Sequence, residues 1–183
     1  TNIELPQVQR EMLALLKTTG KPLVYVNCSG SAMGMVPETQ NADAILQAWY
    51  GGECAGEAVA DVLFGDYNPS GKLPVTFYKN AEQLPDFLDY TMKGRTYRYM
   101  KETPLFPFGY GKSYTTFSLD KPSYKKGKVY VTVTNTGEID GCEVVQVYVR
   151  KQGDAEGPNK TLRAFQRVQL KAGESKKVEV LLP

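Results

Sequence analysis

The segment AILQAWYGGECAGEAVADVLFG, residues 44–65, decides the fold. Residues 44–49 form a short apolar run that is typical of a buried strand, and residues 50–52 turn the chain. From about residue 53 to residue 64 a helix follows, and five apolar side chains form the stripe that we expect to face a core: Ala55, Ala58, Val59, Val62 and Leu63. Gly65 ends this helix. A strand that leads directly into a helix indicates an α/β layered domain.

The residues before this segment follow the same pattern. A helix is predicted over residues 6–19, because apolar side chains recur at helical spacing and Pro6 needs no hydrogen-bond partner in a first turn. Residues 22–28 form a second buried strand, and residues 73–77 a short third one. Two or three strands are too few for a parallel α/β sheet. We therefore expect the domain to begin upstream of the first residue of this chain.

The last third of the chain has a different period. Apolar and polar residues alternate over four stretches, which predicts an antiparallel β-sandwich of the fibronectin type III kind: 129–134, 143–149, 164–170 and 176–182. About five strands are visible against roughly seven in that plan, so we expect the sandwich to continue beyond residue 183. The predicted fold class is α/β followed by all-β.

Three segments with different composition set the predicted domain limits. Residues 1–77 form the C-terminal half of an α/β sandwich domain, and residues 116–183 form a fibronectin type III-like domain that is incomplete at its C-terminal end. Residues 78–115 join them. This join is rich in proline and aromatic residues rather than in glycine and serine, so it is predicted to be an ordered interdomain linker.

The composition excludes several classes of function. The chain has 183 residues, of which 22 are basic and 20 acidic, and this balance predicts neither nucleic-acid nor membrane binding. Histidine is absent, which removes the commonest general base and most zinc sites. The three cysteines, Cys28, Cys54 and Cys142, are far apart, and a buried thiol is predicted for each. We predict no metal and no cofactor.

Hydrolysis without histidine would rest on two carboxylates, which in a retaining glycosidase lie about 5–5.5 Å apart. Glu53 is the most suggestive carboxylate, because it follows Trp49 and Tyr50 at the carboxyl end of a strand, where open α/β sheets bind ligands. Aromatic rings also suit the apolar face of a sugar. The alternative is structural: Glu53 stabilises the start of a helix, and Trp49 and Tyr50 pack in the core.

Three blocks of the sequence resemble family 3 glycoside hydrolases, in the order of that family and over nearly the whole chain. The first block runs from Trp49 through WYGGE and ADVLFGDYNPSGKLP to Pro74. The second comprises GRTYRY at 94–99 and PLFPFGYGKSYT at 104–115, and the third is GCEVVQVYV at 141–149. The opening TNIELP and the GRTYRY motif are most similar to the β-xylosidase branch.

The resemblance implies a parent enzyme with an N-terminal barrel that carries an aspartate nucleophile. In this branch it places the acid/base glutamate just upstream of Leu5 and Pro6, before this chain begins. It therefore assigns no catalytic residue here, and leaves Trp49, Tyr50 and Glu53 as weak substrate-binding candidates. It implies a secreted or periplasmic protein.

The function that the resemblance implies is a share in a larger enzyme. The chain would be the C-terminal fragment of a retaining exo-acting β-glycosidase that hydrolyses terminal β-xylosyl or β-glucosyl residues of plant-type oligosaccharides. It would supply scaffold and part of an active-site wall, and it would be inactive alone. Its partners would be the missing N-terminal portion and, through the missing barrel, the β-linked oligosaccharide. The choice between xyloside and glucoside stays open.

A second hypothesis is a non-catalytic β-sandwich module that binds carbohydrate or protein. Aromatic side chains exposed together on one face of the sandwich would favour it. Tyr130, Tyr148 and Phe165 lie within the alternating patterns, however, so we expect them to have core or cross-strand roles.

Overall fold

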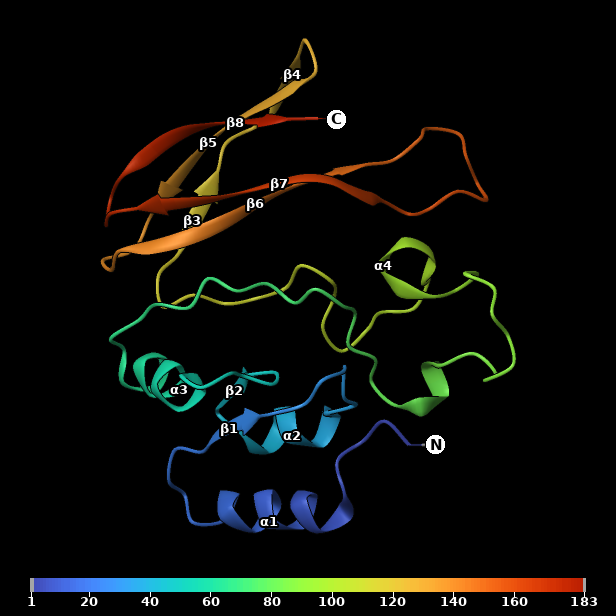
Figure 1. Ribbon diagram of the computed structural model, residues 1–183, viewed down its shortest axis with the longest axis vertical. Helices are drawn as coiled ribbons and strands as arrows, with labels where there is room; N and C mark the ends of the chain where they lie inside the picture. The colour runs from blue at the N-terminus through green and yellow to red at the C-terminus, as the bar shows by residue number, and fades with distance from the viewer. Residues whose placement is uncertain (1, 183) are drawn as a thin grey trace. The chain divides into compact units, whose positions relative to one another are not determined.

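The computed structural model describes residues 2–182 and divides the chain into two compact units (Figure 1). The first takes the chain up to Ala60, then Val75–Thr96 and Met100–Phe108; the second takes Asp61–Pro74, Tyr97–Tyr99 and the described residues from Gly109 onward. The first unit is α/β and the second is built on β-strands, as the sequence predicts. The units interleave along the chain, so the limits 1–77, 78–115 and 116–183 remain a prediction.

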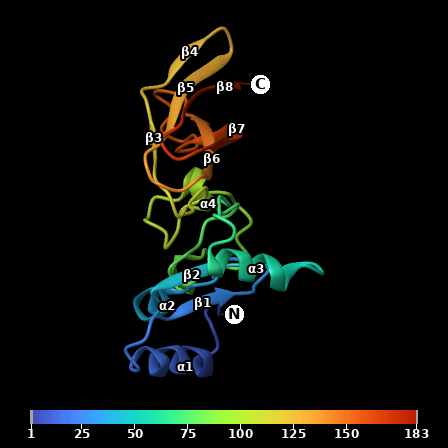
Figure 2. The ribbon, with the colours of Figure 1, turned by 90° about the vertical axis from the view of Figure 1, so that its left-hand side faces the viewer.

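The first unit is built around two short parallel strands. Its elements are α1 (Gln7–Lys17), β1 (Val24–Asn27), α2 (Val36–Asn41), β2 (Ala44–Gln47) and the 3-10 helix η1 (Ala81–Gln83). In the register of β1 and β2, Val24 lies opposite Ala44 and Asn27 opposite Gln47. Helix α1 lies on one side of this strand pair (Figure 2). Two further helices, α3 (Ala55–Phe64) and α4 (Thr96–Tyr99), belong partly to each unit.

Helix α1 buries only a small part of its apolar surface. It begins directly after Pro6, and Gly20, with φ +68°, reverses the chain beyond its C-terminal end. Leu13 is its one buried residue among those described. The neighbouring apolar stripe faces outward, with exposed fractions of 71% for Val8 and 70% for Leu15. Half of the amphipathic face therefore has no partner within the described residues.

A buried ion cluster fixes the start of α1 in the first unit. The Arg10 guanidinium donates to Glu4 Oε2 at 2.6 Å, to Glu38 Oε1 at 3.1 Å and to the Gly34 carbonyl at 3.0 Å. Glu38 is 1% exposed, and its Oε2 has no hydrogen-bond partner among the described residues. A buried carboxylate depends on such pairing, because its desolvation is costly. The cluster therefore makes Arg10 a structural cation.

Several predicted elements of the first unit differ from the observed ones. Residues 73–77 form no strand, because Pro74 has no N–H to donate to a ladder. Phe77 makes only an isolated antiparallel bridge to Phe106. Helix α2 was not predicted, although Pro37 near its N-terminus is a start signal. Helix α3 has no buried residue, so the stripe expected to face a core is only half-buried or exposed.

The second unit is a β-sandwich with six strands among the described residues: β3 (Phe117–Leu119), β4 (Ser123–Lys125), β5 (Lys128–Asn135), β6 (Gly141–Val149), β7 (Thr161–Leu170) and β8 (Ser175–Leu181). Strand β5 pairs with β3 and β4 on one edge and with β8 on the other, and β6 pairs with β7 in a second sheet. All of these pairs are antiparallel. The four long strands fall where the alternating pattern predicts them.

The core of the sandwich is contiguous and made of branched aliphatic side chains. Seven buried residues from both sheets contact one another: Val131, Val133, Val145, Val168, Leu170, Val178 and Val180. Val133 and Leu170 are fully buried. In β5 and toward the ends of β7 and β8 these residues occupy every second position, so the period-two pattern there places them on the inner face.

Candidate functional site

The carboxyl ends of β1 and β2 carry a hydrogen-bonded group of polar side chains in the first unit. Asn27, which is 5% exposed, donates to Gln47 Oε1 at 2.6 Å and to Ser29 Oγ at 2.9 Å. Its Oδ1 accepts the Tyr25 hydroxyl at 2.8 Å. The Ser29 hydroxyl in turn donates to the Ser31 carbonyl at 2.9 Å. This network closes the last rung of the strand pair and orders the loop that follows β1.

Burial and charge act on the Tyr25 hydroxyl behind this network. Partial burial raises the pKa of Tyr25 above its usual 10.0, and the nearby Glu38 and Cys28 charges act in the same direction. Tyr25 therefore stays protonated and remains a donor to Asn27. The network has one fixed hydrogen-bond direction from Tyr25 through Asn27 to Ser29.

Trp49 ends the run that follows β2 in a backbone conformation that bulky residues seldom adopt. Its φ is +57°, in the left-handed region, which costs a non-glycine residue of the order of 1 kcal/mol. Its ring packs edge-on against Phe77 at a centroid distance of 6.1 Å, and Phe77 is fully buried and packs edge-on against Phe106 at 6.2 Å. Trp49 is thus anchored in the core of the first unit, as the structural alternative expects for this residue.

Tyr50 points the other way, and its side chain is 78% exposed. Its ring lies against Gly30, where a Cβ atom would be only 2.6 Å from Tyr50 Cε2. Glycine at position 30 therefore lets the loop after β1 approach the ring. The core packing expected in the structural alternative is wrong for Tyr50, which presents an aromatic surface beside the polar network.

Glu53 is exposed in the turn before α3, and no hydrogen bond or ion pair engages its carboxylate within residues 2–182. The structure does not bring it together with Trp49 and Tyr50 into one enclosed site. Cys28 and Cys54, in the two neighbouring turns, are exposed, so the prediction of buried thiols is wrong for both; Cys142 is buried, as predicted.

The amide, hydroxyl and aromatic groups at this edge of the sheet are suited to a polar ligand. Amide and hydroxyl groups can exchange hydrogen bonds with the hydroxyls of a sugar, and an exposed tyrosine can cover an apolar sugar face. Asn27, Ser29 and Gln47 were not singled out in the sequence. The available signal was their position at the ends of two successive strands, but only the register shows that they meet.

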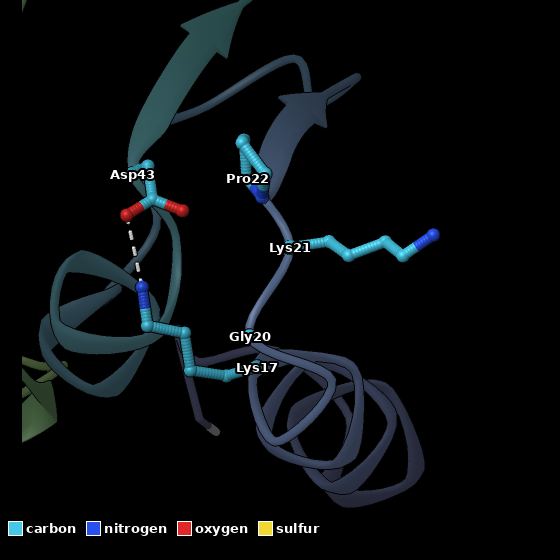
Figure 3. Close-up of a pocket in the computed structure, with 5 residues that line it drawn as sticks. All are labelled: Lys17, Gly20, Lys21, Pro22 and Asp43. Carbon is cyan, nitrogen blue, oxygen red and sulfur yellow. Dashed lines mark hydrogen bonds and ion pairs between the residues drawn. The ribbon is translucent and has the colours of Figure 1, made fainter.

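The small cavity of the first unit lies at the opposite edge, where the strands begin (Figure 3). It has a volume of about 210 Å³ and is lined by Lys17, Gly20, Lys21, Pro22 and Asp43. Lys17 pairs with Asp43 at 2.9 Å, and the other Asp43 oxygen accepts the Leu23 N–H at 2.8 Å. These bonds, the one from Leu23 first, lower the pKa of Asp43 below its usual 3.8. The pair attaches the end of α1 to the sheet, which explains these side chains structurally.

Two segments that carry the family resemblance, 67–72 and 109–115, are linked to each other and to β6 by hydrogen bonds and an ion pair in the second unit. Asn68 Oδ1 accepts the Ser113 hydroxyl at 2.8 Å and the Tyr114 N–H at 2.9 Å. Lys72 pairs with Glu143 of β6 at 2.9 Å and donates to the Gly111 carbonyl at 3.0 Å. At Gly111 a Cβ atom would lie 2.2 Å from the Gly71 carbonyl oxygen. The backbones of these two segments are therefore in direct contact, which requires glycine at position 111.

The same segments reach the outer side of the β6–β7 sheet. Arg167 of β7 donates to Ser70 Oγ at 3.2 Å and to Tyr67 Oη at 3.1 Å. Tyr148 of β6 packs edge-on against Tyr97 at 5.9 Å and lies under the Lys160 ammonium at 4.4 Å. These aromatic and cationic contacts occupy a face that a glycan-binding module would leave free.

Two other aromatic residues of the sandwich complete this test. Tyr130 of β5 is partly covered by the Lys177 ammonium at 5.4 Å, a cross-strand role of the kind predicted. Phe165 is 68% exposed, which excludes the core role and leaves the cross-strand role that was the other expectation. It lies opposite Gln146 on the outer side of β7, where the alternating pattern gives no information on which face is covered.

No group of three or more histidine, cysteine, aspartate or glutamate residues within 2–182 could hold a metal ion. None of the helices in this range is long and apolar enough to cross a membrane.

An α/β unit and a fibronectin-like sandwich in one chain define the C-terminal part of a class of glycosidases. The family model of the glycosyl hydrolase family 3 C-terminal domain matches residues 1–114, and that of the fibronectin type III-like domain matches residues 143–183. The chain belongs to glycosyl hydrolase family 3.

Curated relatives carry the names of two related activities. A xylan 1,4-beta-xylosidase of Xylanibacter ruminicola is 57% identical over 96% of this chain and 21% of the relative. A periplasmic beta-glucosidase of Salmonella typhimurium is 45% identical over 97% of this chain and 26% of the relative. The chain thus spans about a fifth to a quarter of the length of these curated relatives.

Solved structures share the fold of the whole chain. DesR, a beta-glucosidase from Streptomyces venezuelae solved with D-glucose, has a TM-score of 0.89 and 33% identity, covering 100% of this chain and 26% of that one. A β-glucosidase from Erythrobacter marinus has a TM-score of 0.86 and 40% identity, again covering 100% of this chain and 26% of that one.

Proposed function

We propose that this chain acts as the C-terminal part of a retaining exo-β-glycosidase that removes terminal β-xylosyl or β-glucosyl residues from plant-type oligosaccharides. The observation that carries the proposal is the 57% identity to a xylan 1,4-beta-xylosidase over 96% of the chain. In this role the chain contributes scaffold and one wall of the substrate site. As the family resemblance implies, the sugar-binding barrel, the nucleophile and the acid/base would then lie outside the segment that this chain matches, which is 21% of the Xylanibacter ruminicola xylosidase.

The geometry of the first unit supports a wall rather than a catalytic centre. The exposed Tyr50 ring and the half-buried Ser29 hydroxyl provide one apolar and one polar contact at the carboxyl edge of β1 and β2, and the buried Asn27 amide holds Ser29 in place. Glu53 is exposed in the turn before α3, outside any enclosed site of the kind a hydrolytic pair of carboxylates needs. We assign the contact with sugar to Tyr50, its support to Trp49, and no catalytic role to Glu53.

The compartment and the partners of the chain follow from the same proposal. A relative at 45% identity is named periplasmic, and we propose a secreted or periplasmic location for the protein of which this chain is a part. Its partners are then the upstream portion of a family 3 enzyme and, through that portion, a β-linked oligosaccharide. The contacts of Tyr148 and Arg167 on the outer side of β6–β7 weigh against a separate glycan-binding module, and Phe165 is the one aromatic side chain of these two strands that stays largely exposed on that side.

The test compares the chain alone with a chimera in which it replaces the matched segment of the Xylanibacter ruminicola xylosidase. On aryl β-xylosides and β-glucosides we expect no turnover by the chain and measurable turnover by the chimera. In the chimera, Tyr50→Ala should raise KM about tenfold with little change in kcat, and Glu53→Gln should change neither by more than about twofold.

Two outcomes would contradict the proposal. One is turnover by the isolated chain that survives repurification and disappears on substitution of an aspartate or glutamate within residues 1–183. The other is a folded chimera that turns over neither type of glycoside, with the unmodified Xylanibacter ruminicola enzyme as the positive control.

A further inference from the structure

In the loop from Pro85 to Met92, four large apolar side chains remain exposed and are not covered by any other part of the described chain. The exposed fractions are 85% for Phe87, 76% for Leu88, 85% for Tyr90 and 49% for Met92. Single exposed apolar residues are ordinary, but four within six positions of one loop concentrate apolar surface in the way that an interaction site does. We call these four side chains the exposed loop patch.

The loop is held in one conformation by its own polar groups. The Asp86 carboxylate accepts the Leu88 N–H at 2.8 Å, and the Asp89 carboxylate accepts the Thr91 N–H at 2.8 Å. The Asp89 N–H also donates to the Asp86 carbonyl at 3.1 Å. Two successive Asx turns therefore fix the backbone and point the apolar side chains outward. A loop that is already ordered loses little conformational entropy when a partner covers it.

Both ends of the loop are attached to the first unit. Gln83 donates to Glu102 Oε2 at 3.0 Å and to the Thr103 carbonyl at 3.3 Å. At the other end the Arg95 guanidinium donates to the Asp89 carbonyl, and the Arg95 N–H donates to the Met92 carbonyl at 3.1 Å. These bonds hold the patch as a rigid projection of this unit.

The composition of the patch identifies the kind of partner. Phenylalanine, tyrosine and methionine are enriched at the centres of protein interfaces. A sugar platform needs flat rings, and Leu88 and Met92 offer none, so protein is favoured over saccharide. Two copies of this chain would bring the carboxylates of Asp86 and Asp89 against their own equivalents in a symmetric contact, and like charges there repel.

We infer that the exposed loop patch is a docking surface for the upstream portion of a family 3 enzyme, at an apolar pocket with a basic rim. This inference rests on the proposed function. The match to the Xylanibacter ruminicola xylosidase covers 21% of that enzyme, so most of the xylosidase lies outside the segment that resembles this chain. The apolar patch calls for an apolar pocket, and the carboxylates of Asp86 and Asp89 call for arginine or lysine around it.

Chymotrypsin tests the inference without reference to activity, because it cleaves after phenylalanine, leucine and tyrosine. In the isolated chain we expect rapid cleavage at 87, 88 and 90, identified by mass spectrometry. In the chimera the same bonds should be cleaved at least about tenfold more slowly, because a docked loop must first open. Tyr124, in the exposed β4 strand of the other unit, is the matched control and should react equally in both proteins.

Two sets of variants sharpen the result. In the isolated chain, F87S/Y90S should leave the melting temperature within about 2 °C, since the rings are exposed; in the chimera it should lower it by about 4 °C or more. D86N/D89N keeps both Asx turns, because the asparagine oxygen accepts the same N–H, but removes the charge. In the chimera this variant should weaken protection of the loop by about twofold or more at low salt and have less effect at high salt.

The outcomes separate this inference from the proposed function. An active chimera whose loop is cleaved as fast as in the isolated chain would overturn the inference alone. A folded chimera that protects the loop but has no glycosidase activity would overturn the proposed function alone. A chimera that fails to fold would count against both, because a docking surface should accept a segment that is 57% identical to the original.

Discussion

The β-sandwich and the α/β unit differ in how completely they bury their apolar residues. The sandwich encloses seven mutually contacting aliphatic residues between two sheets. The α/β unit buries Leu5, Leu13, Met35 and Phe77 but leaves Val8 and Leu15 of α1 and the exposed loop patch in contact with solvent. The sandwich thus has its own core, whereas the α/β unit presents surfaces suited to partners. Regularly spaced apolar residues therefore form an enclosed core in the sandwich, whereas on α1 they stay partly exposed.

The largest expected effect tests this contrast directly with one substitution in each unit. Leu170→Ala removes a fully buried side chain from the sandwich core and should lower the free energy of unfolding by about 2–5 kcal/mol. Leu15→Ala removes a side chain that is 70% exposed and should change it by less than about 0.5 kcal/mol. Urea unfolding of the isolated chain measures both. Equal losses would show that the two leucines are packed alike.

A second substitution asks whether the α/β unit depends on its charges more than on its apolar core. Arg10→Met leaves the Glu38 carboxylate, which is 1% exposed, without its cation. Breaking a buried pair costs about 3–5 kcal/mol, and we expect the lower end because Arg10 and Glu4 are each 23% exposed. The double variant R10M/E38L should recover most of the loss. A stable single variant would show that the Arg10–Glu38 pair contributes little to the stability of this unit.

A third substitution tests the close backbone contact between Gly111 and Gly71 in the second unit. Gly111→Ala should cost about 1–3 kcal/mol, because a Cβ atom there would lie 2.2 Å from the Gly71 carbonyl oxygen and neither backbone can yield easily. Gly52→Ala in the α/β unit is the matched control, since nothing lies within 4 Å of its Cβ position. Thermal melting of both variants is the measurement. A neutral Gly111→Ala would mean that the two segments move apart freely.

The smallest effect concerns a surface ion pair of the sandwich, in contrast to the buried cluster around Arg10. The Lys128 ammonium lowers the pKa of Glu179 below its usual 4.5, first through their hydrogen bond and then through its charge. Since the folded pKa lies below the unfolded one, this stabilisation is present above pH 4.5 and is lost as the pH falls through the folded pKa. Lys128→Met should bring the Glu179 pKa, followed by NMR, back toward 4.5. An unchanged pKa would contradict the pairing.

Much of the fold could be predicted because the spacing of apolar residues in the sequence reflects which face of a strand or helix is buried. The four alternating stretches became the four long strands, and the resemblance to family 3 was confirmed. The prediction of a strand over residues 73–77 was wrong, because Pro74 has no N–H to donate to a neighbouring strand. The left-handed backbone of Trp49 could not be predicted, because the surrounding packing and not the residue type imposes it.

The candidate site was predicted less well than the fold. Trp49, Tyr50 and Glu53 were chosen by their place in the chain, yet Trp49 packs inward and Tyr50 outward. Asn27 and Gln47 are 20 residues apart, and only the parallel register makes them neighbours. Exposure was also misjudged for Cys28 and Cys54, because the sequence neighbours of a residue do not show what covers its side chain.

Trp49 has one more consequence, which is spectroscopic. It is the single tryptophan of the chain, and its indole rests against Phe77 in the α/β unit. Excitation at the red edge of protein absorption therefore reports on that unit alone, while the sandwich contributes no indole emission. Circular dichroism in the far ultraviolet instead averages over the whole backbone. A chain whose emission maximum shifts at a lower temperature than its dichroism would reveal two separate melting events without any added label.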